Sequence, residues 1–331
     1  MKNGEDKMKA THRVLGLVFA LAFVFASGES AAQSYPNKPI RIVVGFLPGG
    51  GTDVTSRIVA PKLSELLGQP IIVENKPGAE ARIATEFVAK AAPDGYTLLA
   101  GASGQMVFNP GLFAPLPYDP EKAFIPITLF NNDPLVIAVN PSLPVHTIKE
   151  LVALAKAKPG QLFHASAASA FHVATEFFNK QAGVKIVNVP YKGAAPALTA
   201  AVSGEASMMM MSIPPIMAQM KAGKLRPIAI TGDKRSRFLP DIPTVLESGL
   251  DFEGVTWAGL FAPAGTPSAI IDKIYGALAV VLKDESMKQR FTSMGQDTTG
   301  MGMPPAEFGV FYRKELAKWT KAIKEMGVRG E

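Results

Sequence analysis

The stretch that decides the fold runs from residue 40 to residue 68 and reads IRIVVGFLPGGGTDVTSRIVAPKLSELLG. Ile40–Phe46 is a run of mostly apolar, β-branched residues, which is typical of a buried strand. Val54–Leu67 carries apolar residues at helical spacing and stops at Gly68, which predicts an amphipathic helix. A buried strand that leads directly into a helix is the building unit of an α/β protein.

The loop between that strand and that helix, Leu47–Asp53, contains three consecutive glycines. Glycine lets the backbone approach a ligand closely, and the start of a helix offers unpaired N–H groups and a positive dipole end. We therefore expect an anion site here, with Thr52 or Asp53 as the N-cap of the helix. The glycines are not followed by Lys-Ser/Thr and do not fit G-x-G-x-x-G, so no nucleotide-binding loop is indicated. A simple turn with a helix cap remains the alternative.

The rest of the chain repeats the alternation of short apolar strands and helices, which predicts a largely parallel α/β protein. Two extended stretches, Asn131–Val139 and about Glu253–Leu260, are expected to cross between two lobes. Lobe 1 then comprises residues 33–133 and 255–331, and lobe 2 comprises residues 134–254. A ligand is expected in the cleft between the lobes, where loops at the carboxyl ends of the strands converge.

The first 32 residues have the layout of a secretory signal peptide. Positive residues precede the apolar run Val14–Phe25, and small residues Ser30 and Ala32 stand at positions −3 and −1 of a cleavage site before Gln33. A membrane anchor is the alternative, but the 12-residue run is shorter than the roughly 20 residues that span a bilayer. We expect export to the periplasm; Met8 is as natural a start as Met1.

Composition excludes several classes of protein. The 331 residues include no Cys, which removes disulfides, thiolate metal sites and a cysteine nucleophile. The net charge of +6 is spread along the chain with no basic-aromatic block, so no nucleic-acid partner is expected. Neither G-x-S-x-G nor H-E-x-x-H occurs. We predict a protein that is not an enzyme and has no cofactor and no metal.

Other strand-end loops carry candidate ligand contacts. They are Ser103 in the Gly101–Gln105 loop, the stretch Ala165–His172, and Tyr191 with Lys192. His172 could donate to a carboxylate or merely pack. The run Met208–Met211 is more typical of a core strand, although alternation sends two Met side chains to each face and one could line a pocket.

Blocks along the whole chain after the signal segment resemble, in order, the Bug-type solute receptors of tripartite tricarboxylate transporters. The blocks are YPNKPIR (35–41), PGGGTD (48–53), GQPIIVENKPG (68–78), APDGYT (92–97), LPYDP (116–120), AKAKPG (155–160), VPYKG (189–193), AGKLR (222–226), LPDIPT (239–244) and FAPAGTP (261–267).

The resemblance implies a two-lobed periplasmic binding protein of the Venus-flytrap type with two crossing strands. It also implies a small carboxylate ligand, held largely by backbone amides and waters from the first-strand loop. The ligand contacts expected on this basis are Phe46, Pro48, Gly49, Gly50, Gly51, Thr52, Asp53, Ser103, Ser166, Ala167, Ser169, His172, Tyr191 and Trp257.

The chain departs from the family pattern at positions expected to face the cleft. Leu47 stands where Pro is usual, Glu80-Ala81-Arg82 replaces Gly-Gly-Asn, and Met211 stands where many members carry Asp. The third loop, Ala165–His172, lacks the usual glycines. These changes suggest a more apolar ligand than an amino acid or citrate.

In one hypothesis Arg82 binds a second carboxylate of the ligand, because Arg suits bidentate carboxylate recognition. Met210 or Met211, the latter beside Ser212, then contacts an aromatic or long aliphatic body of the ligand. The alternative for Arg82 is an exposed side chain paired with Glu86.

The leading interpretation is therefore a monomeric periplasmic receptor that delivers an organic anion to membrane transporter subunits. A receptor that presents its closed form to a sensor kinase is the alternative. An exported α/β hydrolase would need a nucleophile elbow and a late His, whereas the last His is residue 172. The identity of the carboxylate lies beyond the sequence.

Overall fold

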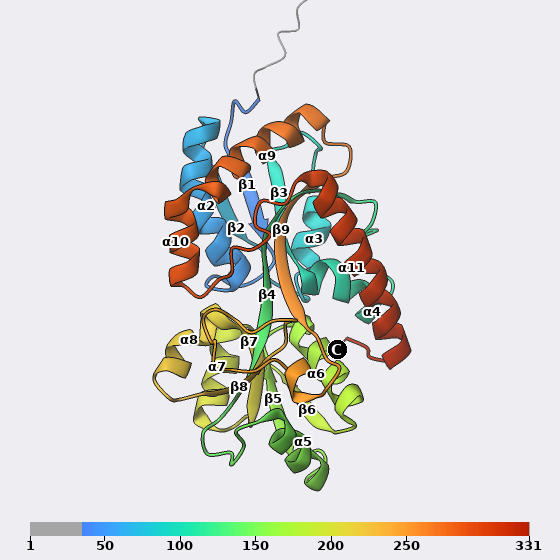
Figure 1. Cartoon of the computed structure of the whole chain (residues 1–331). Coiled ribbons are helices and arrows are strands. Elements are labelled where there is room, and N and C mark those ends of the chain that lie inside the picture. The colour runs from blue at the N-terminus through green and yellow to red at the C-terminus, as the bar shows by residue number, and fades with distance from the viewer. Residues whose placement is uncertain (1–34, 331) are drawn as a thin grey trace, which may run out of the picture. The chain divides into compact units, whose positions relative to one another are not determined.

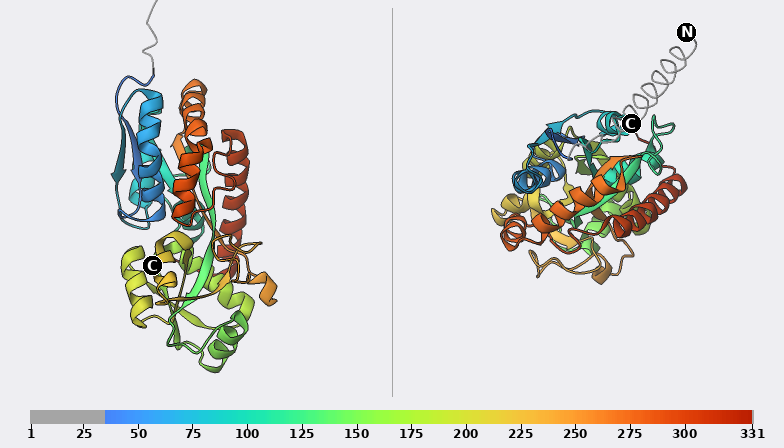
Figure 2. Two further views of the ribbon diagram at one scale, coloured as in Figure 1. Left: turned by 60° about the vertical axis from the view of Figure 1, so that its left-hand side comes forward. Right: turned by 90° about the horizontal axis from the view of Figure 1, so that it is seen from above.

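Strand β4 (Phe124–Val139) joins two sheets of a mixed α/β fold, seen in a computed structural model that describes residues 35–330. Its first part pairs with β9 (Val255–Pro263) as far as Pro134. Its second part pairs with β7 (Met208–Ser212) from Leu135 and with β8 (Arg226–Ile230) from Val136. Figure 2 shows β4 in green passing from one sheet to the other. The chain is thus two-lobed, with β4 and β9 as the crossing strands.

Lobe 1 is built on the strand order β2-β1-β3-β9-β4. Its further strands are β1 (Ile40–Val44), β2 (Ile71–Asn75) and β3 (Thr97–Ala102). Its helices are α2 (Gly51–Leu67), α3 (Arg82–Ala89), η1 (Gly104–Phe108), α4 (Asn109–Leu112), α9 (Ser268–Lys283), α10 (Glu285–Ser293) and α11 (Pro305–Met326). β1 is parallel to both β2 and β3, whereas β9 is antiparallel to β3 and β4. The predicted parallel pairing is therefore found among β1, β2 and β3, whereas the crossing strands β4 and β9 pair antiparallel.

Lobe 2 is built on the order β4-β7-β5-β6, with β8 also paired to β4. Its other strands are β5 (Leu162–Ser166) and β6 (Ile186–Pro190). Its helices are α5 (Ile148–Ala157), α6 (Ser169–Ala182), α7 (Ala194–Ser203), α8 (Ile213–Lys221) and the short 3₁₀ turn η2 (Leu246–Ser248). Thr147 caps α5 by accepting a hydrogen bond from Glu150 N–H, as its type predicts.

Helices cover both faces of the lobe-1 sheet (Figure 1). Helices α2 and α9 contact each other on one face. On the other face, α3, η1 and α11 enclose a cluster that includes Val43, Phe261, Phe308 and Trp319. Side chains of a strand alternate between faces, so β1 buries residues on both. The prediction of a fully buried first strand is confirmed at all of its positions except Arg41.

The four methionines of β7 divide between two cores. Met208 and Met210 belong to one cluster, Met209 and Met211 to another, and all four are buried. This is the period-2 alternation predicted from the sequence. Their first role is therefore packing of the lobe-2 sheet.

Candidate functional site

The first-strand loop leads from β1 into α2. The N-cap of α2 is Gly50, not Thr52 or Asp53 as the sequence predicted. The helix starts earlier because Asp53, in its first turn, reaches back and accepts the Gly49 N–H at 3.0 Å. A carboxylate in the first turn that accepts a donor ahead of the helix replaces the side-chain cap expected at the N-cap itself.

The Asp53 carboxylate is fully occupied inside this loop. It is 2% exposed and accepts hydrogen bonds from Arg57 Nε at 3.0 Å and Asn75 Nδ2 at 2.9 Å. Burial by itself raises the pKa of Asp53, but the hydrogen bonds from Arg57, Gly49 and Asn75 outweigh it and hold that pKa below its ordinary value. Asn75 also donates to the Phe46 carbonyl at 3.0 Å. Asp53 therefore acts as the anchor of the loop, with Asn75, which sequence reasoning missed.

The start of α2 keeps the donors that the sequence predicted. The first hydrogen bond within the helix runs from Val54 N–H to the Gly50 carbonyl. The N–H groups of Gly51 and Thr52 therefore have no carbonyl partner in the helix, and they lie at the positive end of its dipole. This end can accept an anion without any cationic side chain.

A second loop of lobe 1 follows β2 and has an unusual backbone. Ala79, Glu80 and Ala81 have φ angles of 48°, 54° and 66°, and Gly78 precedes them at 133°. Each non-glycine residue in this left-handed region costs roughly 1–2 kcal/mol. Two of the three, Glu80 and Ala81, stand where the resemblance leads us to expect glycines, and strained backbone of this kind is concentrated at functional sites.

Glu80 reaches from this loop to lobe 2. Its Oε2 accepts the backbone N–H of Ser169, the first residue of α6, at 2.9 Å. Asn109 ties the two together, since its Nδ2 donates to the Glu80 carbonyl at 2.7 Å and its Oδ1 accepts the Ser169 hydroxyl at 3.1 Å. Sequence reasoning noted Glu80 as a departure but did not select it or Asn109; no local pattern links them to Ser169.

Arg82 does not form the pair with Glu86 that was the alternative considered for it. Its Nε donates to the Ala79 carbonyl at 2.8 Å, and its guanidinium lies 3.9 Å from the Phe113 ring centre. Glu86 pairs instead with Lys90 at 2.5 Å. Arg82 therefore braces the strained loop, and its proposed contact with a ligand stays a hypothesis.

The lobe-2 loops lie at the carboxyl ends of β5, β6 and β7. Ser166 is buried and donates to the Ala168 carbonyl, while its own carbonyl accepts Tyr191 N–H at 2.8 Å. His172 is half-buried, with Nε2 3.9 Å from Glu176. The hydroxyl of Tyr191 donates to Glu205 at 2.9 Å. Ala167 and Ser212 are partly exposed at the same strand ends.

Ser103 and Trp257 lie deeper in lobe 1. Ser103 Oγ accepts the Trp257 N–H at 3.5 Å, and both residues are buried. The indole packs among Phe261, Phe308 and Tyr312 with ring centroids 5.9–6.3 Å away. Its Nε1 is buried without a hydrogen-bond partner. Trp257 thus belongs to the aromatic core beneath the loops.

The facing loops of the two lobes meet at two places on this side. One is the bond between Glu80 and Ser169. The other is Leu47, which is half exposed and whose Cδ1 would lie 3.7 Å from a Cβ built at Gly193. The ends of β1, β2, β5 and β6 are therefore brought together, as the predicted interlobe site requires.

A second meeting of the lobes lies beside the crossing strands. Arg237 of lobe 2 lies 3.7 Å from the Asp297 carboxylate of lobe 1 and donates to Thr292 at 3.2 Å. Next to it, Asp133 accepts Asp297 N–H at 3.1 Å and is buried in β4. Burial raises the pKa of Asp133 to about 6, although Asn131 and Asp297 N–H donate to its carboxylate. No local pattern in the sequence pointed to this cluster.

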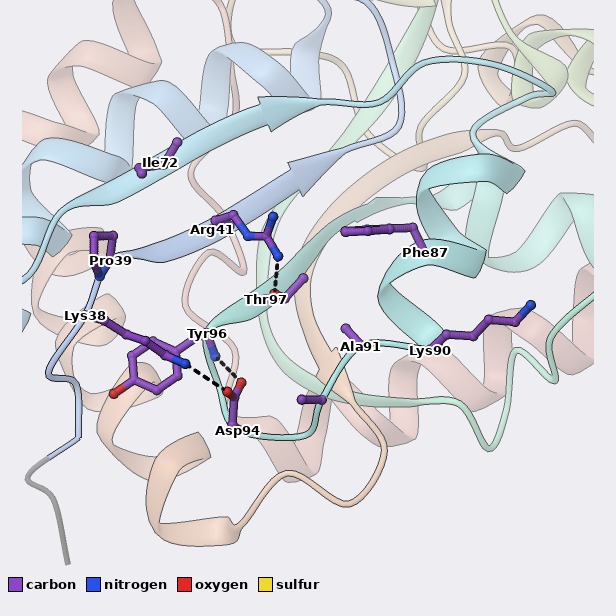
Figure 3. Close-up of a pocket in the computed structure, with 11 residues that line it drawn as sticks. Lys38, Pro39, Arg41, Ile72, Phe87, Lys90, Ala91, Asp94, Tyr96 and Thr97 are labelled. Carbon is purple, nitrogen blue, oxygen red and sulfur yellow. Dashed lines mark hydrogen bonds and ion pairs between the residues drawn. The ribbon is translucent and has the colours of Figure 1, made fainter.

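A cavity of about 680 Å³ lies at the other edge of the lobe-1 sheet, near the amino ends of β1 and β3 (Figure 3). Its charged residues are paired locally. Lys38 lies 3.3 Å from Asp94, and Arg41 donates to Thr97 at 3.2 Å and lies 3.6 Å from Glu74. Because ligands of such folds bind outside the carboxyl ends of the strands, this cavity is not the candidate site.

Two further searches covered residues 35–330. In that range, no cluster of three or more His, Asp or Glu side chains is arranged to hold a metal ion. No helix in the described part of the chain has the length and apolar character needed to cross a membrane. The predicted signal peptide, residues 1–32, and its cleavage site lie outside the described residues.

Comparison with known proteins gives consistent matches. Residues 55–328 match the family model "Tripartite tricarboxylate transporter family receptor". Protein BugT of Bordetella pertussis is 32% identical over 320 residues, which cover 96% of this chain and 97% of BugT.

Two solved structures share the fold at similar identity. "R. palustris Rpa4515 with adipate" has a TM-score of 0.84 and 32% identity, and the match covers 89% of this chain and 99% of that one. "MatC (Rpa3494) from Rhodopseudomonas palustris with bound malate" has a TM-score of 0.82 and 30% identity, covering 87% and 100%.

Proposed function

The chain belongs to the tripartite tricarboxylate transporter family of receptors, and we propose that it captures a small organic carboxylate between its lobes. It would then deliver the ligand to the membrane subunits of a transporter. Receptors of this family are periplasmic solute-binding proteins, which is not a class of enzymes. The proposal includes export of the chain, with cleavage before Gln33. It also includes action as a monomer, without catalysis and without a cofactor.

One observation supports the proposal most strongly: helix α2 of lobe 1 begins at a strand end with N–H groups that lack a carbonyl partner, beside loops that touch across the lobes. Helix starts stabilise negative charge through their N–H groups and dipoles. The two similar solved structures are named with adipate and malate, both of which are carboxylates.

We assign the main contact with the ligand carboxylate to the start of α2. The N–H groups of Gly51 and Thr52 would bind it, with the Phe46–Gly50 loop held in place by Asp53. The remaining proposed contacts are Ser103, Ser166, Ala167, Ser169, His172, Tyr191, Met211, Ser212 and Trp257. Of these, Met211 and Trp257 are buried, so their contribution would be to shape the wall beneath the loops.

Ligand binding is proposed to bring the lobes together by a hinge motion. The lobes would be residues 33–133 with 255–331, and residues 134–254, so that the hinge lies where β4 changes partners. A ligand that contacts both lobes binds the closed state better and shifts the population toward it.

The test is a calorimetric titration of the chain lacking residues 1–32 with mono-, di- and tricarboxylates, and with glucose as a neutral control. Gly51→Pro removes one N–H at the first helical position, where Pro is well tolerated. Gly51→Ala is the matched control, since nothing lies within 4 Å of a Cβ at Gly51. We expect Gly51→Pro to weaken carboxylate binding at least tenfold and Gly51→Ala to change it less than threefold. Equal affinities would contradict the assignment to α2, and no binding of any carboxylate would contradict the receptor function.

A further inference from the structure

We propose that Glu80 sets the class of ligand: its carboxylate fills the start of α6, so the receptor selects a ligand with a single carboxylate. This inference rests on the proposed carboxylate-binding function and names its substrate class. A second carboxylate of a ligand, aimed at lobe 2, would meet a site that the chain itself already occupies.

The contact is that of a bound carboxylate. Glu80 Oε2 accepts the Ser169 N–H at 2.9 Å at the first position of the 14-residue helix α6. Helix starts attract anions because their first N–H groups lack carbonyl partners and the dipole is positive there. Within residues 38–330, Glu80 has no ion pair with Lys, Arg or His, and the Ser169 N–H at the start of α6 is the hydrogen-bond donor that its carboxylate has there.

The loop that carries Glu80 is built to hold it there. The Glu80 carbonyl accepts Asn109 Nδ2, and the Ala79 carbonyl accepts both the N–H and the Nε of Arg82, at 3.1 and 2.8 Å. Ala81 is buried against Gly45, where an added Cβ would lie 2.4 Å from the Ala81 Cβ. Residues on both sides of Glu80 are therefore fixed, although the backbone at residues 79–81 is left-handed.

The Glu80 carboxylate at the start of α6 also acts against ligands that carry a second carboxylate. The Glu80 carboxylate repels a second carboxylate of a ligand, because both groups are negatively charged. A ligand with a single carboxylate is not repelled and loses no contact. Leu47, exposed beside Gly193 at the same edge, offers apolar contact to the body of such a ligand. The similar structures with adipate and malate hold dicarboxylates, so this chain would differ from them in its specificity.

The experiment titrates the chain lacking residues 1–32 with two length-matched pairs, hexanoate with adipate and butyrate with succinate. The variants are Glu80→Gln, which removes the charge but keeps an acceptor, and Glu80→Gly, which empties the start of α6. Glu86→Gln is the matched control, because Glu86 lies on the next turn and pairs with Lys90. Circular dichroism checks that each variant folds.

We expect the unsubstituted chain to bind the monocarboxylate of a pair at least tenfold tighter. Glu80→Gly should shift the ratio at least tenfold toward the dicarboxylate, Glu80→Gln should shift it less, and Glu86→Gln should leave it within twofold. A preference of the unsubstituted chain for dicarboxylates, or a ratio that Glu80 substitutions do not move, would overturn this inference but not the receptor function. If no carboxylate binds the chain or its variants, both fail together.

Discussion

Two loops of lobe 1 reach the interlobe region at the same edge of the sheet. They differ in which residues adopt positive φ angles and in what their carboxylates bind. The Phe46–Asp53 loop uses glycine where φ is positive, at Gly49, and buries its one carboxylate in hydrogen bonds from Gly49, Arg57 of α2 and Asn75 of β2, all within lobe 1. The Gly78–Arg82 loop places Ala79, Glu80 and Ala81 in the left-handed region and extends its carboxylate to the other lobe.

The Gly78–Arg82 loop departs from the family pattern at more positions than the Phe46–Asp53 loop, which departs at Leu47. The first loop leaves N–H groups of α2 without a carbonyl partner, whereas the second occupies an N–H group of α6 with the chain's own side chain. Because left-handed alanine and glutamate are costly, a sequence keeps them only where the surrounding contacts hold them. The first loop therefore fits the proposed anion site, and the second fits the specificity proposed for Glu80.

The largest effect is expected from Asp53→Ala. The substitution leaves the N–H of Gly49 and the side chains of Arg57 and Asn75 without their acceptor, and hydrogen bonds to a charged group contribute about 1.5–3 kcal/mol. We expect a loss of about 3 kcal/mol in the free energy of unfolding by urea, with carboxylate affinity reduced at least tenfold. Asp272→Ala, on the exposed side of α9, is the control and should change stability by less than about 0.5 kcal/mol. A small effect at Asp53 would mean that the first loop holds itself without its carboxylate.

A second test breaks the contact between the loops. Gly45→Ala places a Cβ 2.4 Å from the Ala81 Cβ, and neither atom can rotate away. Overpacking of this kind costs about 1–3 kcal/mol, and we expect about 2 kcal/mol by urea denaturation. Ala81→Gly by itself relieves the left-handed backbone at φ of 66°, and the double variant Gly45→Ala with Ala81→Gly should be more stable than the sum of the two single effects predicts. Effects that simply add would show that the two segments are not coupled through this contact.

A third test exchanges the backbone preferences of the two loops. Gly49→Ala puts a Cβ on a residue with φ of 88° and should destabilise the chain by about 1 kcal/mol. Ala79→Gly removes the Cβ from a residue with φ of 48° and should stabilise it by about 1 kcal/mol or slightly less, because glycine also gains entropy in the unfolded chain. Thermal unfolding measures both. Changes of the same sign would contradict the contrast drawn between the loops.

The smallest effect is expected from pH. Hydrogen bonds hold the pKa of Asp53 below its ordinary value of 3.8 in the folded chain. A lowered carboxyl pKa stabilises the fold above the unfolded pKa, and this contribution disappears as pH falls through the folded pKa. Urea denaturation from pH 6 to pH 3 should therefore lose less stability in Asp53→Asn than in the unsubstituted chain. Equal losses of stability in the two proteins would show that protonation of Asp53 is not what destabilises the fold in acid.

Much of the fold could be predicted from short segments of the sequence. The Gly68 end of α2, the Thr147 cap of α5 and the strand β7 each follow from a few neighbouring residues. The part of β4 before Asn131 could not, because Pro126 conceals a strand that forms by pairing with β9, more than 120 residues later. Likewise, η1 directly after β3 was expected to be a loop.

The α/β class, the strand-end loops and the resemblance to a receptor family could be predicted from the sequence, because periodicity, glycine placement and ordered motifs are local properties of the chain. Three contacts needed the folded chain: Asp53 holds its own loop, Arg82 holds the Ala79 carbonyl, and Glu80 reaches lobe 2. They could not be predicted because a side chain's partner depends on where the backbone brings distant segments together. Glu80 and Ser169 are 89 positions apart, and no sequence pattern around either residue predicts its contact with the other.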